Sequence, residues 1–326
     1  MTSIKEALNF YIESVSSSRS ENTARTYKNA VNSFCASLSQ KNISVEEKNV
    51  SELPDDSISW FASALKDYSA STERLYLVAV CGFFEFIAAE NLAAPNLPRI
   101  RLLLKQRARK PGQRLPQFPR NSIEKVIEYA INIAQSPVNN DSDRLLNMRD
   151  KAFILTLADT GLRVHEACNL RRGDIDWNEG RALVIGKGDR QAVVRFSGRS
   201  LSSLREYLGL RAKLDGASGR PLASLPLFSR HDRGAGDKIK KITTTTGRNI
   251  IKDRVKEALG ENADQNITPH SFRHYFVTTI LRASGNMKLA QELARHKSIA
   301  VTQLYTHLSN DELDEGYWEI FNQNSK

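Results

Sequence analysis

The sequence is poor in cysteine and has no long hydrophobic run. Its three cysteines, Cys35, Cys81 and Cys168, are widely spaced and odd in number, which argues against a disulfide framework or a zinc site and fits reduced thiols in the cytoplasm. The longest apolar stretch, Leu75–Ala89, is too short to span a bilayer. Because the N-terminus also lacks the apolar core of a signal peptide, we expect a cytoplasmic protein with no membrane partner.

Acidic residues are scarce relative to basic ones. The chain holds 47 lysines and arginines against 37 aspartates and glutamates among its 326 residues, which gives a net charge of +10. Such a protein is a candidate binder of polyanions, because basic side chains neutralise phosphates and release their counterions. Charge alone does not separate nucleic acid from an anionic membrane surface.

The length of the chain suggests two domains. Residues 1–95 show apolar residues at helical spacing and no alternating pattern, which predicts a small domain of four or five helices. Residues 120–326 hold further helices and two alternating segments, Arg181–Ile185 and Ala192–Phe196, which predict a β-hairpin with Lys187 at its tip. The expected fold class is mainly α with a small β-sheet (α+β).

Residues 96–119 differ from both flanks, since they are rich in proline and contain no acidic residue. We expect an interdomain linker. A merely solvated, flexible linker is the simpler interpretation, but contact with a phosphate backbone better explains charge of a single sign between two domains. Its basic residues are Arg99, Arg101, Lys105, Arg107, Arg109, Lys110 and Arg114. Further candidates for phosphate contact, in the second domain, are Lys238, Lys240, Lys241, Arg248 and Lys252.

A short motif, TGLRVHEA at residues 160–167, interrupts the helical pattern of the second domain. Its Thr-Gly break predicts the start of a new helix, with Arg163 in the first turn. Glu166 follows three residues later, on the same side of the helix, and is close enough to buttress the arginine. The motif therefore predicts an arginine held in a fixed direction.

Residues 268–308 hold two histidines, an arginine and a tyrosine that can meet around one phosphate. A Thr-Pro pair opens a helix and places His270 and Arg273 on one face. A glycine stop and an asparagine cap then predict a second helix that ends at His296, and a last helix carries Tyr305. Taken singly, the first pair is more typical of a solvated helix face and the tyrosine of a half-buried core position.

Six residues together would complete a site for phosphoryl transfer: Arg163, Lys187, His270, Arg273, His296 and Tyr305. The two arginines make a bidentate clamp on phosphate oxygens. Tyr305 offers a nucleophile whose pKa near 10 requires a base, for which His270 is suited. Lys187 can protonate the leaving oxygen, and His296 can hydrogen-bond the phosphate. No clustered carboxylates suited to magnesium accompany these motifs.

With these motifs in place, the chain resembles the tyrosine recombinases of the phage integrase family. The motifs are TGLR with Arg163, GKG with Lys187, HSFR with His270 and Arg273, ARHKS with His296 and TQLYTHLS with Tyr305. They follow the order and spacing of the family and cover residues 120–320. The N-terminal domain resembles the core-binding domain of the family more loosely, through ENTARTYKNAVNSF.

The resemblance implies a site-specific DNA recombinase whose two domains clamp duplex DNA. Tyr305 would become linked to a DNA 3′-phosphate and free a 5′-hydroxyl, and the strands would be rejoined without a metal ion, cofactor or ATP. A homo-tetramer on two DNA sites is implied, alone or with a second recombinase. The apolar C-terminal residues 311–322 would dock on their own protomer or on a neighbour, and the sequence does not distinguish the two.

Arg295 departs from the family pattern, in which a glycine commonly precedes the second histidine. Its charged side chain could contact phosphate or bend the site. Two other functions remain open on the same fold: an accessory or regulatory DNA-binding protein that lacks the chemistry, and a nicking-closing enzyme without partner exchange. The presence of all six motif residues favours the recombinase.

Overall fold

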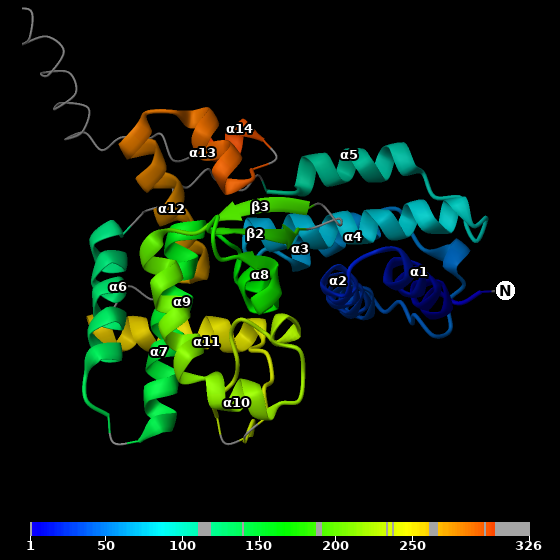
Figure 1. Ribbon diagram of the computed structural model, residues 1–326. Helices are drawn as coiled ribbons and strands as arrows, with labels where there is room; N and C mark the ends of the chain where they lie inside the picture. Colours follow the sequence, from blue (N-terminus) through cyan, green and yellow to red (C-terminus); the bar gives the residue numbers. More distant parts are fainter. Residues whose placement is uncertain are drawn as a thin grey trace, which may run out of the picture. The chain divides into compact units, whose positions relative to one another are not determined.

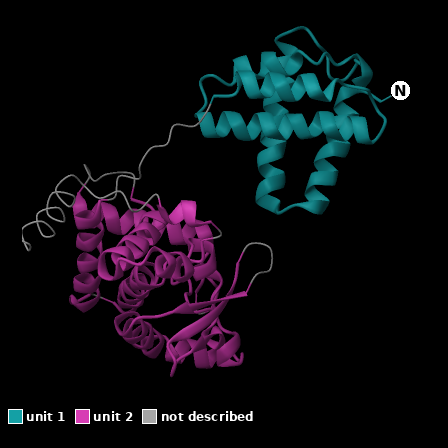
Figure 2. Ribbon diagram, turned by 90° about the horizontal axis from the view of Figure 1, so that it is seen from above, with its two compact units in different colours: residues 1–114 teal, residues 115–326 magenta. Residues whose placement is uncertain are grey.

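The computed structural model describes residues 2–109, 119–138, 140–186, 191–232, 234–236, 238–260, 267–296 and 298–303. The chain divides into two compact units, Met1–Arg114 and Leu115–Lys326 (Figure 2). The described elements are helices with one three-stranded sheet, which confirms the predicted α+β class. Four predicted site residues, Lys110, Arg114, Lys187 and Tyr305, lie outside the described residues, as do residues 311–322.

The described part of unit 1 contains five α-helices and one short 3-10 helix (Figure 1). They are α1 (Ile4–Ser18), α2 (Glu21–Ser39), η1 (Val50–Glu52), α3 (Ser57–Ala64), α4 (Ala70–Ala89) and α5 (Leu97–Arg107). Serine side chains cap α1, α2 and α4 by accepting backbone N–H groups of the first turn. The core is aromatic, with Phe34, Phe61, Phe83 and Phe84 fully buried, so unit 1 has a hydrophobic centre of its own.

Helix α5 occupies a part of the chain that we predicted to be linker. Asn96 caps it, and Pro98 stands in its first turn, where a missing N–H group costs no hydrogen bond. Ile100 is fully buried against the core of unit 1, and Leu103 and Leu104 pack on the same core. The linker prediction for residues 96–119 is therefore wrong for 97–107, because apolar residues at helical spacing outweigh the basic composition.

The described part of unit 2 contains the sheet and the remaining described helices. In chain order these are α6 (Arg120–Gln135), α7 (Asp141–Thr160), α8 (Val164–Asn169), η2 (Arg172–Asp174), β1 (Ile175–Asp176), β2 (Arg181–Ile185), β3 (Gln191–Arg195), α9 (Gly198–Leu210), α10 (Ala212–Ala217), η3 (Leu222–Ser224), α11 (Thr244–Leu259), α12 (Pro269–Ser284), α13 (Met287–Ala294) and α14 (Ile299–Gln303). Helix α7 is buried along most of its length and packs against α6, α9 and α12 (Figure 1). It is the central helix of the unit.

The sheet has the order β1-β2-β3 and is antiparallel throughout. The predicted hairpin is confirmed, since Arg181 pairs with Arg195 and Ile185 with Gln191. One face of the hairpin packs on the core of unit 2 and the other is exposed. In β2, for example, Ala182 and Val184 are buried in that core and the residues between and beside them are exposed. Within the described ranges, no helix combines the length and hydropathy needed to cross a membrane.

Candidate active site

Arg163 stands at the junction between α7 and α8. Gly161 ends α7 in the left-handed conformation, with φ of 60°, and the ring of Phe276 occupies the space that a Cβ atom would need. Both features require glycine at this position. Arg163 is the residue that precedes α8, not part of its first turn as predicted, because its backbone is extended. Its side chain is 44% exposed.

Glu166 fixes the direction of Arg163. Its buried carboxylate accepts hydrogen bonds from the backbone N–H of Arg163 at 2.9 Å and from Nη1 at 3.0 Å, so the predicted contact is present. Burial raises the pKa of Glu166, but Arg295 and Arg163 more than offset this and hold it below its usual range. The carboxylate is therefore charged at neutral pH.

Helix α12 carries His270 and Arg273. Thr268 precedes the helix as predicted, and its backbone N–H donates to the Ser271 hydroxyl at 3.1 Å. His270 lies on the first turn and remains exposed, whereas Arg273, one turn later, is only 2% exposed. The ring of His274 packs edge-on against His270, with 4.4 Å between ring centroids.

Arg273 joins two parts of the site. Its Nη1 donates to the carbonyl oxygen of Gly161, two residues before Arg163, and its Nη2 donates to that of Ala294, two residues before His296. A buried guanidinium that holds two backbone carbonyls brings the α7–α8 junction and the end of α13 to one place. The structure thus brings together the segments of Arg163, Arg273 and His296, whereas the other two predicted members, Lys187 and Tyr305, lie outside the described residues.

His296 follows α13, which ends as predicted near Arg295, and it contacts the last described helix. Its Nδ1 lies 2.9 Å from the hydroxyl oxygen of Thr302 on α14. Its backbone N–H donates to the Gln291 carbonyl oxygen. Thr302 is fully buried and stands three residues before Tyr305. We did not predict a role for this threonine from the sequence. Its position three residues before the candidate nucleophile was the signal that could have identified it.

The histidine pKa values are lowered at this site. Burial is the largest cause at His270, followed by the charges of Arg273 and Arg163. The same causes, with smaller contributions from the neighbouring histidines, lower the pKa of His296 to about 4. The residue as a whole is still exposed, so solvent screens part of the pKa shift at His270. Both rings are therefore neutral at pH 7, the form that can accept a proton.

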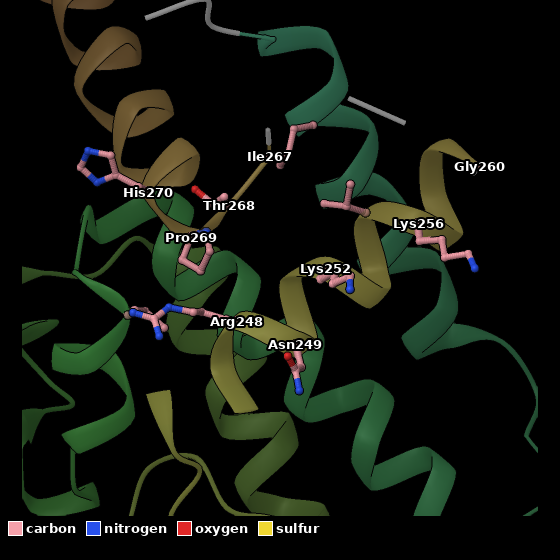
Figure 3. A pocket seen from close by; sticks show the side chains of 11 residues that line it. Arg248, Asn249, Lys252, Lys256, Gly260, Ile267, Thr268, Pro269 and His270 are labelled. Carbon is pink, nitrogen blue, oxygen red and sulfur yellow. The ribbon is translucent and has the colours of Figure 1, made fainter. Parts of the chain in front are cut away.

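The exposed face of α11 is basic and leads toward His270. Arg248, Lys252 and Lys256 recur every four residues and are all exposed. Together with the beginning of α12 they line a cavity of about 820 Å³ (Figure 3). Of the four described catalytic candidates, only His270 lines it. The cavity is thus a positively charged approach beside the site, suited to a phosphate backbone.

The other basic candidates divide into two kinds. Arg99 and Arg101 make exposed ion pairs with carboxylates of unit 1, at 2.8 and 2.6 Å, and such pairs are weak enough to exchange for phosphate. Lys241, like Lys238 and Lys240, is exposed. Arg109 instead donates to the buried carboxylate of Glu73 and to two backbone carbonyls. These contacts give Arg109 a structural role in unit 1, while its side chain remains 44% exposed, so the predicted phosphate contact stays a prediction.

Sequence families match both units. Residues 124–312 match the phage integrase family, and residues 8–91 match the N-terminal SAM-like domain of phage integrases. A tyrosine recombinase XerC from Anoxybacillus flavithermus is 27% identical over 318 residues, which cover 96% of each chain. A tyrosine recombinase XerC from Roseiflexus sp. is 30% identical over 294 residues, which cover 89% of this chain and 84% of the relative.

Solved structures share the fold. The XerH site-specific recombinase, bound to a palindromic difH substrate in a post-cleavage complex, has a TM-score of 0.66 and 19% identity and covers 90% of this chain and 79% of its own. A lambda integrase dimer bound to a COC′ core site has a TM-score of 0.63 and 17% identity, and the match covers 94% of this chain and 96% of the integrase chain. The family match extends over more than half of the residues. The chain therefore belongs to the phage integrase family of tyrosine recombinases.

Proposed function

We propose that this chain is a site-specific recombinase that cuts and rejoins duplex DNA through a 3′-phosphotyrosine on Tyr305, with no need for a metal ion or ATP. One observation carries the proposal: buried Arg273 donates to the Gly161 and Ala294 carbonyls and so brings the segments of Arg163 and His296 together. Consistent with this, both guanidinium charges lower the pKa of His270 and of His296. A negatively charged phosphate would be stabilised where these positive and neutral groups meet. The XerH and lambda integrase structures are DNA complexes, which supports duplex DNA as that partner.

The two arginines would bind the non-bridging oxygens of the scissile phosphate. Arg163 reaches solvent while Glu166 holds one of its Nη atoms, so the rest of its planar fork can meet an incoming phosphate. Arg273 is buried and bonded to two carbonyls, so it supplies a positive charge whose position is fixed in advance. A single fixed donor of this type stabilises a transition state by about 3 kcal/mol.

Tyr305 would be the nucleophile, activated by His270. A neutral imidazole accepts the phenolic proton while the phenolic oxygen bonds to phosphorus. The bond from phosphorus to the DNA 5′-oxygen breaks, and Lys187 gives that oxygen a proton, which leaves a 5′-hydroxyl. The tautomer of His296 that accepts from Thr302 at Nδ1 carries its proton on Nε2, from which it can donate to a phosphate oxygen.

Rejoining would run through the same groups in reverse. The phosphotyrosine bond retains the energy of the phosphodiester, so a 5′-hydroxyl from a partner duplex can displace Tyr305 without ATP. Exchange between two duplexes requires a protomer at each of four cleavage positions. We therefore propose a homo-tetramer on two DNA sites, alone or with a second recombinase, acting in the cytoplasm.

Basic residues of both units would hold the DNA backbone. Each phosphate that a lysine or arginine neutralises releases counterions and adds about 0.9 to the salt dependence of binding. The proposed residues are Arg99, Arg101, Lys105, Arg107, Arg109, Lys110, Arg114, Lys238, Lys240, Lys241, Arg248 and Lys252.

The test is covalent trapping on duplexes selected from a random library for binding to the full chain. Each duplex carries a nick close to the cleavage position, so that a released fragment prevents religation. We expect the wild-type chain to form a protein–DNA adduct and Tyr305→Phe to bind equally well without forming one. Binding without an adduct by both chains would favour an accessory DNA-binding protein instead.

A further inference from the structure

Arg295 has a backbone conformation that arginine rarely adopts. It ends α13 with φ of 58° and ψ of 43°, in the left-handed region. Among the described residues, the other two non-glycine residues with positive φ are asparagines, Asn42 and Asn91, whose short side chains tolerate this region. The backbone N–H of Arg295 closes the helix end by donating to the carbonyls of Gln291 and Glu292, and the side chain makes a buried contact of its own.

The contact is an ion pair with Glu166. Nη2 of Arg295 donates to Oε2 of Glu166 at 3.0 Å, and the two side chains are only 12% and 1% exposed. The same oxygen accepts the backbone N–H of Arg163 at 2.9 Å. Two arginines from different elements, the start of α8 and the end of α13, thus share one buried carboxylate.

The neighbours of Arg295 in the chain both belong to the candidate site. The carbonyl oxygen of Ala294 accepts a hydrogen bond from Arg273, and the ring of His296 contacts Thr302 on α14, three residues before Tyr305. The ion pair therefore links the turn that carries His296 to the α7–α8 junction that carries Arg163. A guanidinium so enclosed and directed at a carboxylate is poorly placed to contact DNA.

We propose that Arg295 is a positioning residue, which keeps the His296 turn in register with Arg163 through their shared partner Glu166. The inference rests on the proposed recombinase function. It assigns the arginine that replaces the family's glycine a defined task, instead of the phosphate contact that the sequence left open.

The test is a double-mutant cycle on the full chain, read on a duplex that wild type cleaves. The variants are Arg295→Gly, Glu166→Gln and the double variant. Arg295→Lys tests rescue by a conserved charge, and Lys288→Ala, exposed on α13, is the matched control for loss of one charge. Single-turnover cleavage at saturating protein, the Kd at several salt concentrations and the Tm are measured for each.

We expect Arg295→Gly to cleave about 10- to 100-fold more slowly, the range for a small displacement of catalytic groups. Its Kd and salt dependence should match wild type, Arg295→Lys should recover part of the rate, and Lys288→Ala should cleave normally. In the Glu166→Gln background, Arg295→Gly should lower the rate by less than about twofold.

Two results would overturn the inference. One is a normal cleavage rate in Arg295→Gly. The other is an equal loss of cleavage rate from Arg295→Gly in the wild-type and Glu166→Gln backgrounds, together with weaker DNA binding and a salt dependence of binding reduced by about one, which would indicate a phosphate contact. Failure of wild type to form any adduct on a duplex that it binds would instead reject the proposed function itself.

Discussion

Arg163 and Arg273 are predicted to fail in different ways when each is replaced by alanine. Both variants should lose cleavage, because each removes one charged donor from the phosphate clamp. Arg273→Ala should also destabilise unit 2 more strongly than Arg163→Ala does. The reason is burial: the Arg273 side chain lies in the interior and holds two carbonyls, whereas the Arg163 side chain is 44% exposed.

The magnitudes follow from these contacts. Removing one fixed donor of charge lowers cleavage by about 100- to 1000-fold. Arg273→Ala also leaves the Gly161 and Ala294 carbonyls without this donor, at about 1–2 kcal/mol each, or about 2–4 kcal/mol together. For a unit of this size that lowers the Tm by roughly 5–15 °C. Arg163→Ala removes a half-exposed guanidinium from the buried Glu166 carboxylate, which keeps its bond from Arg295, and should cost only about 1 kcal/mol.

The assay pairs single-turnover cleavage on a nicked duplex with thermal unfolding of the same DNA-free preparation. Arg273→Lys is the matched control, because it keeps the charge but lacks the planar fork that reaches two carbonyls. Arg273→Ala that unfolds like wild type would refute the role given to its buried hydrogen bonds. Either alanine variant cleaving at a near-normal rate would refute the clamp.

Three further predictions concern binding, pH and the backbone. Lys252→Gln should reduce the slope of log K against log salt by about 0.9, measured by titration with duplex DNA, while Lys213→Gln, outside the proposed contacts, should not. Burial, and then the charges of nearby arginines, lower the pKa of His231 to about 4. Because this value lies below the unfolded value of 6.5, the stability that neutral His231 contributes above pH 6.5 should be lost as the pH falls toward 4. The free energy of unfolding of His231→Gln should therefore depend less steeply on pH over this range. Gly161→Ala, which forces a Cβ into left-handed backbone and onto the Phe276 ring, should cost about 2–4 kcal/mol in unfolding experiments; wild-type stability would contradict it.

Much of the site was predictable because its sequence signals are local. Thr268 before Pro269 predicts the start of α12, and a glycine at 285 predicts its end, as the structure confirms. The positions of His270 and Arg273 then follow from helical spacing. The hairpin around Lys187 was equally clear, because strand alternation depends only on neighbouring residues.

The remaining features depend on contacts between residues far apart in the chain. The bonds from Arg273 to Gly161 and Ala294 join three segments, and no spacing rule reports them. Composition misled the linker prediction, since buried Ile100 shows that one apolar face is enough for packing. The pairing of Arg295 with Glu166 likewise needed the fold, because 129 positions separate the two residues.

The most direct test of the account is to identify the residue and the DNA end joined in the trapped adduct. Nuclease and protease digestion followed by mass spectrometry should give a nucleotide on the peptide that contains Tyr305, and the released strand should accept phosphate from a kinase at a free 5′-hydroxyl. The adduct should also form in the presence of a metal chelator. A nucleotide on any other residue, or a 5′-linked protein, would contradict the mechanism.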